Sequence, residues 1–261
     1  MKPTLVMPYH DPKGTEFPHL EAILPLLNTL FQNAILGVTP ITLMSQPAAI
    51  RTLEANPFFD VFHQEPDLSV GEQFHALYAH AATACHPAQM LHLCFCDRLI
   101  FALQSGHRET FLHDIQSVTV RDAPLVFARS EKAWQTHPQN YRDIEGMATR
   151  AGEWLFGKTL DFAWCHLVIQ TGTLGEILPD VNDPDISMLC EIMLRIRETV
   201  TLKAVDWLVW EDPFFAGCDP AVLKAQREGS LLETQKRLAY ILPTLQLLVR
   251  ASGDLNEKRW I

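Results

Sequence analysis

Short apolar segments that alternate with amphipathic segments constrain the fold of this 261-residue chain more than any other feature. Runs such as Thr4–Met7 and Met90–Cys96 have the length and composition of buried strands. Segments His19–Phe31 and Ser69–Ala84 instead carry apolar residues at helical spacing. Strands that alternate with helices form βαβ units around a parallel sheet. We therefore predict a single α/β domain with a mostly parallel central sheet flanked by helices.

The same patterns extend this prediction along the chain. Asp219 and Pro220 form a strong helix start, and the helix that they open is predicted to run to about Arg250, bent or interrupted near Pro243. The domain is predicted to span residues 1–218, with residues 219–261 as a helical extension packed on it. The other predicted strands are Ala34–Val38, Ile41–Leu43, Phe58–Phe62, Pro124–Ala128, Phe162–Ile169 and Val205–Val209, and the other predicted helices are Pro47–Ala55, Arg108–Ile115, Tyr141–Phe156 and Ile186–Val200.

Composition excludes several classes of function. The net charge of −10 disfavours nucleic acid, because an acidic chain repels polyphosphate. No apolar stretch reaches the length of roughly 20 residues that a membrane span needs. The start Met1-Lys2-Pro3 does not resemble a signal peptide, and the six cysteines form no CxxC pair, so we expect reduced thiols in a cytoplasm. The apolar face of the C-terminal helix could pack on its own domain or form a homodimer.

Polar side chains recur where the predicted strands end. In an open α/β sheet, ligands bind outside the carboxyl ends of the strands. Candidate site residues are therefore those that follow a strand or open a helix near this edge. They are Pro8, Tyr9 and Asp11 after the first strand, Asp97 and Arg98 after the fourth, Glu211 and Asp212 after the last, and Asp185 before a helix.

The order of these segments resembles the GT-A fold of nucleotide-sugar glycosyltransferases. Leu5-Val6-Met7-Pro8-Tyr9 is similar to the family's opening strand and the proline turn under the nucleotide. Leu91–Asp97 resembles the strand that ends in the metal-binding Asp-x-Asp motif, and Phe162–Ile169 resembles the acceptor-side strand. The likeness covers most of residues 4–215 as an order of elements, and its individual motifs are weakly specific.

The resemblance implies transfer of a sugar from a nucleotide diphosphate sugar to a hydroxyl acceptor, with Mn²⁺ or Mg²⁺ as cofactor. Asp97, Glu211 and Asp212 would be the metal ligands, and Asp185 would activate the acceptor hydroxyl. The donor and acceptor would contact Pro8, Tyr9, Asp11, Arg98, Trp164 and His166.

The sequence departs from the family at the metal-binding motif. Arg98 and Leu99 follow Asp97, so the second acid is absent. Glu211 or Asp212 could complete the metal site, or Arg98 could neutralise the diphosphate in place of a metal. Otherwise the chain is a non-catalytic domain that binds a nucleotide, a sugar or a protein. Asp97 and Asp185 could also serve only as helix caps.

Two further hypotheses are weaker. His92, Cys94 and Cys96 alternate, so on one strand they would share a face and could bind zinc with a fourth ligand, although buried cysteines more often act as small apolar residues. A nucleotidyltransferase would need a Gly- and basic-rich loop after the first strand, and residues 9–16 contain only Lys13 and Gly14. The chain also lacks G-x-S-x-G, Walker-type and G-x-G-x-x-G motifs.

Overall fold

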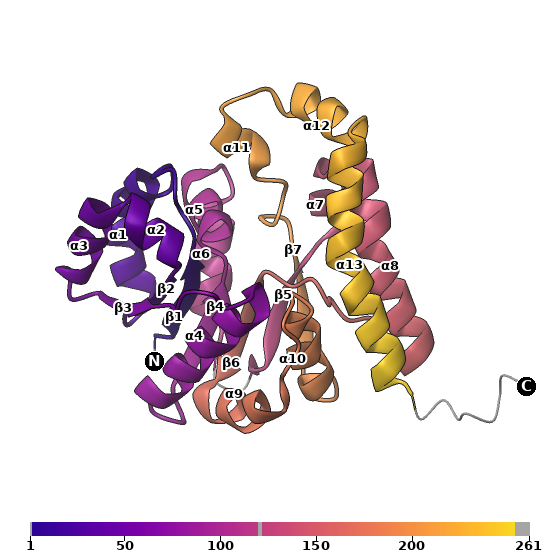
Figure 1. The fold of residues 1–261 in the computed structure, drawn as a ribbon, viewed down its shortest axis with the longest axis horizontal. Coiled ribbons are helices and arrows are strands. Elements are labelled where there is room, and N and C mark those ends of the chain that lie inside the picture. Colours follow the sequence, from indigo (N-terminus) through magenta and orange to yellow (C-terminus); the bar gives the residue numbers. More distant parts are fainter. Residues whose placement is uncertain (1, 120–121, 254–261) are drawn as a thin grey trace, which may run out of the picture.

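The chain forms one α/β domain around a seven-stranded sheet. The computed structural model describes residues 2–119 and 122–253. The strand order is β3-β2-β1-β4-β6-β5-β7; β6 runs antiparallel to β4 and β5, and the other neighbouring pairs are parallel (Figure 1). The prediction of a mostly parallel sheet is therefore confirmed. The strands are β1 Thr4–Tyr9, β2 Ala34–Val38, β3 Phe59–His63, β4 Met90–Cys94, β5 Leu125–Arg129, β6 His166–Gln170 and β7 Thr201–Val205.

Helices cover both faces of the sheet, so each central strand is apolar on both sides. Leu5 and Met7 of β1 belong to a core cluster with α1, α5 and α6, whereas Val6 belongs to a second cluster with α4, α8, α10 and the C-terminal helix α13 (Leu231–Ala251). Successive side chains of a strand point to opposite faces, which explains this division. The helices of this part are α1 Phe17–Leu30, α2 Pro40–Ser45, α3 Pro47–Glu54, α4 Val70–Ala84, α5 Cys96–Gln104, α6 Arg108–Ser117, α7 Glu131–Thr136, α8 Gln139–Phe156, α9 Thr171–Ile177, the 3₁₀ helix η2 Leu178–Asp180 and α10 Met188–Ile196.

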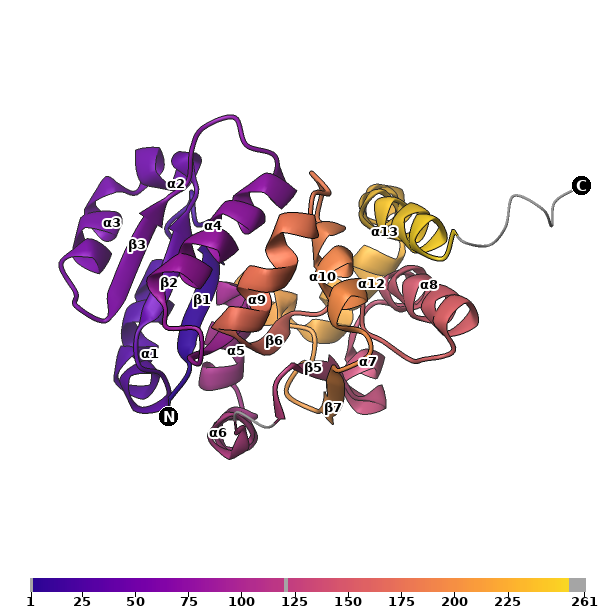
Figure 2. The same cartoon turned by 90° about the horizontal axis from the view of Figure 1, so that it is seen from below.

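The C-terminal region contains three helices, α11 Asp212–Ala216, α12 Pro220–Glu228 and α13 Leu231–Ala251. The predicted continuous helix is thus broken near Gly229, where the Ser230 hydroxyl accepts a hydrogen bond from the Glu233 N–H and begins a new helix. Pro243, the expected point of interruption, lies inside α13. Helix α13 lies along α8 at one end of the sheet (Figures 1 and 2), which agrees with an extension packed on the domain.

Some predicted segments differ from the observed ones. Ile41–Leu43 belongs to helix α2, whose first residue is Pro40, so the prediction of a strand there is wrong. The last strand is Thr201–Val205, and the apolar residues Trp207 and Leu208 are buried in the loop beyond it. Strand β6 begins only at His166, after a buried loop that contains Trp164. None of the helices in the described residues combines the length and the apolar character that crossing a bilayer requires.

Candidate functional site

Three elements bring side chains together at the carboxyl-end edge of the sheet. Strand β4 leads directly into α5, so Asp97 and Arg98 occupy the first turn of that helix. Strand β5 ends at Arg129. Because β6 is antiparallel to β4 and pairs His166 with Cys94, the residue before it, Cys165, lies at the same edge. The order and direction of the strands therefore place these four side chains around one point.

A cavity of about 210 Å³ lies at this point. Asp97, Arg98 and Arg129 line it from the sheet edge. Helix α8 contributes Glu145 and α13 contributes Arg237 and Tyr240. The remaining wall is largely apolar and includes Trp164, whose indole N–H donates to the Leu189 carbonyl at 2.9 Å. A few charged groups in an otherwise apolar hollow are typical of a ligand site.

Ion pairs connect the charged groups around the cavity. Arg98 binds the buried carboxylate of Glu211. Glu145 interacts with two arginines, because its carboxylate lies 3.0 Å from Arg237 Nη1 and 3.8 Å from Arg129 Nη1. Arg129 Nη2 donates to the Cys165 sulfur at 3.3 Å. Three guanidinium groups therefore converge on two glutamates.

The crowding of positive charge changes the ionisation of the neighbouring groups. Burial, and then the nearby charges of Arg129 and Arg98, lower the pKa of His137 to about 2. Burial also lowers the pKa of Arg98, and Arg129 lowers it further. Burial raises the pKa of Asp161, although the charge of Arg129 partly opposes this. His137 is consequently neutral, and the positive charge of this region is carried by the arginines.

The structure brings some of the predicted site residues together and leaves others apart. Asp97, Arg98 and Trp164 line the cavity, and Glu211 reaches it through its pair with Arg98. Asp185 has an exposed side chain beside Ile186, a residue of the cavity wall. The turn before that helix is held instead by Asp183, whose carboxylate accepts from the Asp185 N–H and the Ser187 hydroxyl.

The residues after the first strand form a buried turn. The Asp11 carboxylate accepts hydrogen bonds from three backbone N–H groups, those of Thr15, Glu16 and Phe17, at 2.7, 2.9 and 3.0 Å. The Tyr9 hydroxyl donates to the same carboxylate at 3.3 Å. Tyr9 and Asp11 are 1% and 3% exposed, and Pro8 is partly buried. In this structure Tyr9 and Asp11 anchor the start of α1 and do not border the cavity.

The acids expected to bind Mn²⁺ or Mg²⁺ do not gather into a metal site among the described residues. Glu211 is occupied by Arg98, and the Asp212 carboxylate lies 3.5 Å from Arg227. Asp97 accepts a hydrogen bond from the Arg98 N–H in its own turn. Hard divalent cations need several oxygen ligands together, so these side chains do not fit such an ion in this arrangement.

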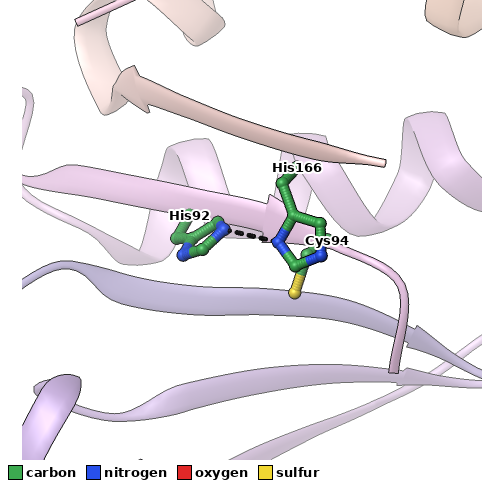
Figure 3. A group of neighbouring side chains, drawn as sticks. All are labelled: His92, Cys94 and His166. Atoms are coloured by element: carbon green, nitrogen blue, oxygen red, sulfur yellow. Dashed lines mark hydrogen bonds between the residues drawn. The ribbon is translucent and has the colours of Figure 1, made fainter. Parts of the chain in front are cut away.

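A different trio of potential ligands lies inside the sheet (Figure 3). His92 and Cys94 share one face of β4, and His166 is paired with Cys94 across the ladder. One potential ligand atom from each of the three side chains lies within 4.8 Å of the other two, and His92 Nε2 is hydrogen-bonded to His166 Nδ1 at 3.0 Å. Cys96, the third expected ligand, is not part of this group because β4 ends before it and it begins α5.

These three side chains could hold a metal, and imidazole and thiolate suit Zn²⁺ better than Mn²⁺ or Mg²⁺. A structural zinc usually takes four ligands, and no fourth side chain joins the group in the described residues. Burial lowers the pKa of His92 to about 3 and that of His166 well below its usual value, so both imidazoles are neutral. A neutral hydrogen-bonded pair packed against Trp207 and Phe111 accounts for the same geometry.

Sequence reasoning did not select Arg129, Glu145 or Arg237. The sequence did contain a signal for Arg129. It directly follows the predicted strand Pro124–Ala128, just as the candidate Asp97 directly follows the predicted strand Met90–Cys96. Glu145 and Arg237 lie inside long helices, where surface charges are common, and only the packing of α13 on α8 brings them to the cavity.

Comparison with known proteins gives no further identification. No protein-family model matches the sequence, and no curated protein is significantly similar to it.

Proposed function

We propose that the chain is a GT-A-like glycosyltransferase that binds a nucleotide diphosphate sugar with its diphosphate in the cavity and transfers the sugar to a hydroxyl acceptor. The observation that carries this proposal is the convergence of Asp97, Arg98 and Trp164 on one cavity at the carboxyl-end edge. Asp97 and Arg98 follow the strand that resembles the family's metal-binding strand, and Trp164 precedes the strand that resembles its acceptor side. The mixed, mostly parallel sheet agrees with the same resemblance.

In the proposed reaction, the acceptor hydroxyl oxygen attacks the anomeric carbon of the sugar. The bond from that carbon to the phosphate oxygen breaks, and the nucleoside diphosphate leaves with the bonding electrons. The hydroxyl proton passes to a carboxylate, for which Asp185 beside the cavity wall remains the candidate. Stabilisation of the negative charge on the leaving diphosphate would supply most of the rate enhancement.

Calorimetric titration of the full chain with a panel of nucleotide diphosphate sugars and nucleoside diphosphates tests binding. We expect saturable heat with at least one of them. A transfer or hydrolysis assay with the same sugar then tests catalysis. Absence of heat with every compound, both with and without Mn²⁺, would remove the proposal.

A second candidate is a non-catalytic domain that binds the same class of ligand. The missing second acid and the exposed position of Asp185 favour it. It predicts nucleotide-sugar binding without turnover. A nucleotidyltransferase ranks below both because the loop after β1 has no glycine cluster, and release of pyrophosphate from a nucleoside triphosphate and a sugar phosphate would reverse that order.

As part of the same proposal we place the protein in a cytoplasm. All six cysteines are free thiols, which is typical of a reducing compartment.

A further inference from the structure

Arg129 is a buried cation with few oxygen partners. The residue is 8% exposed, and its Nε–H has no hydrogen-bond partner among the described residues. Its Nη2 donates to the sulfur of Cys165, which is a weak acceptor. The Glu145 carboxylate lies 3.8 Å away, beyond hydrogen-bonding distance, and is bonded to Arg237 instead. A desolvated guanidinium in this state has unused capacity to bind an anion.

The surroundings of Arg129 add to this capacity. Arg98 and Arg237 also line the cavity, so its wall carries three arginines, together with the acids Asp97 and Glu145 and with Glu211 bound to Arg98. The planar guanidinium binds two oxygens of a phosphate group at once, which makes arginine the residue of choice for phosphates. A cavity of about 210 Å³ has room for a phosphate or a diphosphate, although not for a whole nucleotide.

In the described part of the chain, two of the acids at the cavity are already paired with arginines, Glu211 with Arg98 and Glu145 with Arg237. Arg98 binds the carboxylate of Glu211, and a guanidinium in that position repels a second cation. The positive charge that the family obtains from a metal is therefore already present in side chains.

We propose that this cavity is a diphosphate subsite that works without a divalent metal, with Arg129 and Arg98 as the main contacts and Arg237 as the third. The inference rests on the proposed function for the identity of the ligand, because the diphosphate would be that of the nucleotide sugar. It adds that binding of the donor and departure of the leaving group depend on arginines from β5, α5 and α13.

Calorimetric titration of the full chain with inorganic pyrophosphate and with uridine and guanosine diphosphates, once in EDTA and once in Mn²⁺, tests the proposal. We expect at least one of these anions to bind equally well in both buffers. Arg129→Met should weaken that binding by about tenfold or more. Arg129→Lys should retain only part of the affinity, because lysine keeps the charge but lacks the planar guanidinium that binds two oxygens at once. Arg150→Met is the matched control, since Arg150 is an exposed arginine of α8 that does not line the cavity.

Arg237→Met provides a second readout if Arg129→Met does not fold, because the Arg237 side chain is 29% exposed and less central to the core. It should also weaken binding of the anion. Binding that requires Mn²⁺, or affinities that neither variant changes, would overturn the metal-free subsite while leaving a nucleotide-sugar function intact. Pyrophosphate binding that depends on the arginines, without binding of any nucleotide sugar, would instead remove the proposed function. Absence of all binding would overturn both.

Discussion

Asp97 lines the cavity of the candidate site, and its negative charge acts on the nearby carboxyl group of Glu16. Its Oδ1 accepts from the Arg98 N–H at 2.8 Å, and the residue lines the cavity. Burial, and then the negative charges of Asp97 and Asp11, raise the pKa of Glu16 to about 8. At neutral pH Glu16 therefore holds its proton for most of the time, while Asp97 faces the arginines.

The substitution Asp97→Asn separates a ligand role from a structural one. Asparagine can accept the same hydrogen bond in the first turn of α5, so we expect the free energy of unfolding to fall by less than about 1 kcal/mol. Binding of the nucleotide or its turnover should weaken by about tenfold or more, about 1.4 kcal/mol, because a charged contact is lost. A denaturant titration and one binding isotherm on each protein measure both. Unchanged affinity in a stably folded variant would remove Asp97 from the site.

The same substitution should change the titration of Glu16. Removing the charge of Asp97 removes one of the causes that raise the pKa of Glu16, so this pKa should fall below about 8. It should stay above 4.5, because burial is the larger cause and remains. Side-chain carbon chemical shifts followed by NMR across pH 4 to 9 measure it. The control is Asp180→Asn, at an exposed position on η2, which should leave Glu16 unchanged.

At the scale of elements, the start of α4 is packed against the loop that precedes α10. The Gly71 N–H donates to the Pro184 carbonyl at 2.8 Å. A Cβ on Gly71 would lie 2.4 Å from the Asp183 carbonyl oxygen and 2.6 Å from that of Asp185. Two backbone segments thus approach each other at a distance that only glycine permits, and this contact positions the loop that carries Asp185.

Gly71→Ala should therefore destabilise the protein by about 1–3 kcal/mol, because the added methyl group forces backbone to move. Gly175→Ala in α9 is the matched control: its Cβ would lie 3.8 Å from the nearest atom, an ordinary contact, and alanine favours a helix over glycine. Denaturant unfolding of the two variants measures the difference. Equal stabilities would show that the loop before α10 adapts freely.

The elements found correctly from the sequence are those with strong local signals. The Ser69–Glu72 capping box marks the start of α4, and Gly157 in a left-handed conformation ends α8 as expected. Strand β7 was displaced in the prediction because it is an edge strand whose side chains are mostly exposed or half-buried, while the more apolar run after it is a buried loop. A run of apolar residues indicates a buried segment, and here the buried segment is the loop that follows the strand.

The candidate site could be predicted only in part, for a related reason. Asp97 and Arg98 were accessible from the rule that ligands bind beyond the carboxyl ends of strands. The pairing of Arg98 with Glu211 joins residues 113 positions apart, and that of Glu145 with Arg237 joins residues 92 positions apart. No local pattern specifies such partners, so the cluster of arginines around the cavity became visible only in the folded chain.

In the whole molecule, charged polar groups and neutral polar groups occupy different parts of the sheet. The arginine-lined cavity lies at its edge, while the pair His92–His166 lies inside it, packed between aromatic rings. His137 near the cavity is 2% exposed as well. Three imidazoles are thus held neutral by burial, and burial raises the pKa of two carboxyl groups, those of Glu16 and Asp161. These groups act on the folding equilibrium with opposite signs.

Because the lowered histidine pKa values and the raised pKa of Glu16 act in opposite directions, the free energy of unfolding should be greatest near pH 6.5. The folded-state pKa values of His92 and His137 are about 3 and about 2, below the unfolded value of 6.5, and that of His166 is also lowered. Their contribution to the free energy of unfolding is complete above pH 6.5. It is lost as the pH falls, by about 1.4 kcal/mol per pH unit for each group. The pKa of Glu16 is raised from 4.5 to about 8, so its contribution is complete below pH 4.5 and is lost as the pH rises towards 8.

Between pH 4.5 and 6.5 the three histidines outweigh Glu16, so the free energy of unfolding should rise steeply with pH, and between 6.5 and 8 it should decline gently. Denaturant unfolding at half-unit intervals of pH measures the curve. His137→Gln should reduce the slope on the acid side by about 1.4 kcal/mol per pH unit, and Glu16→Gln should flatten the alkaline side. A curve that instead keeps rising from pH 6.5 to 8 would mean that Glu16 is ionised in the folded protein, and Asp97 would then face a second negative charge at the edge of the cavity.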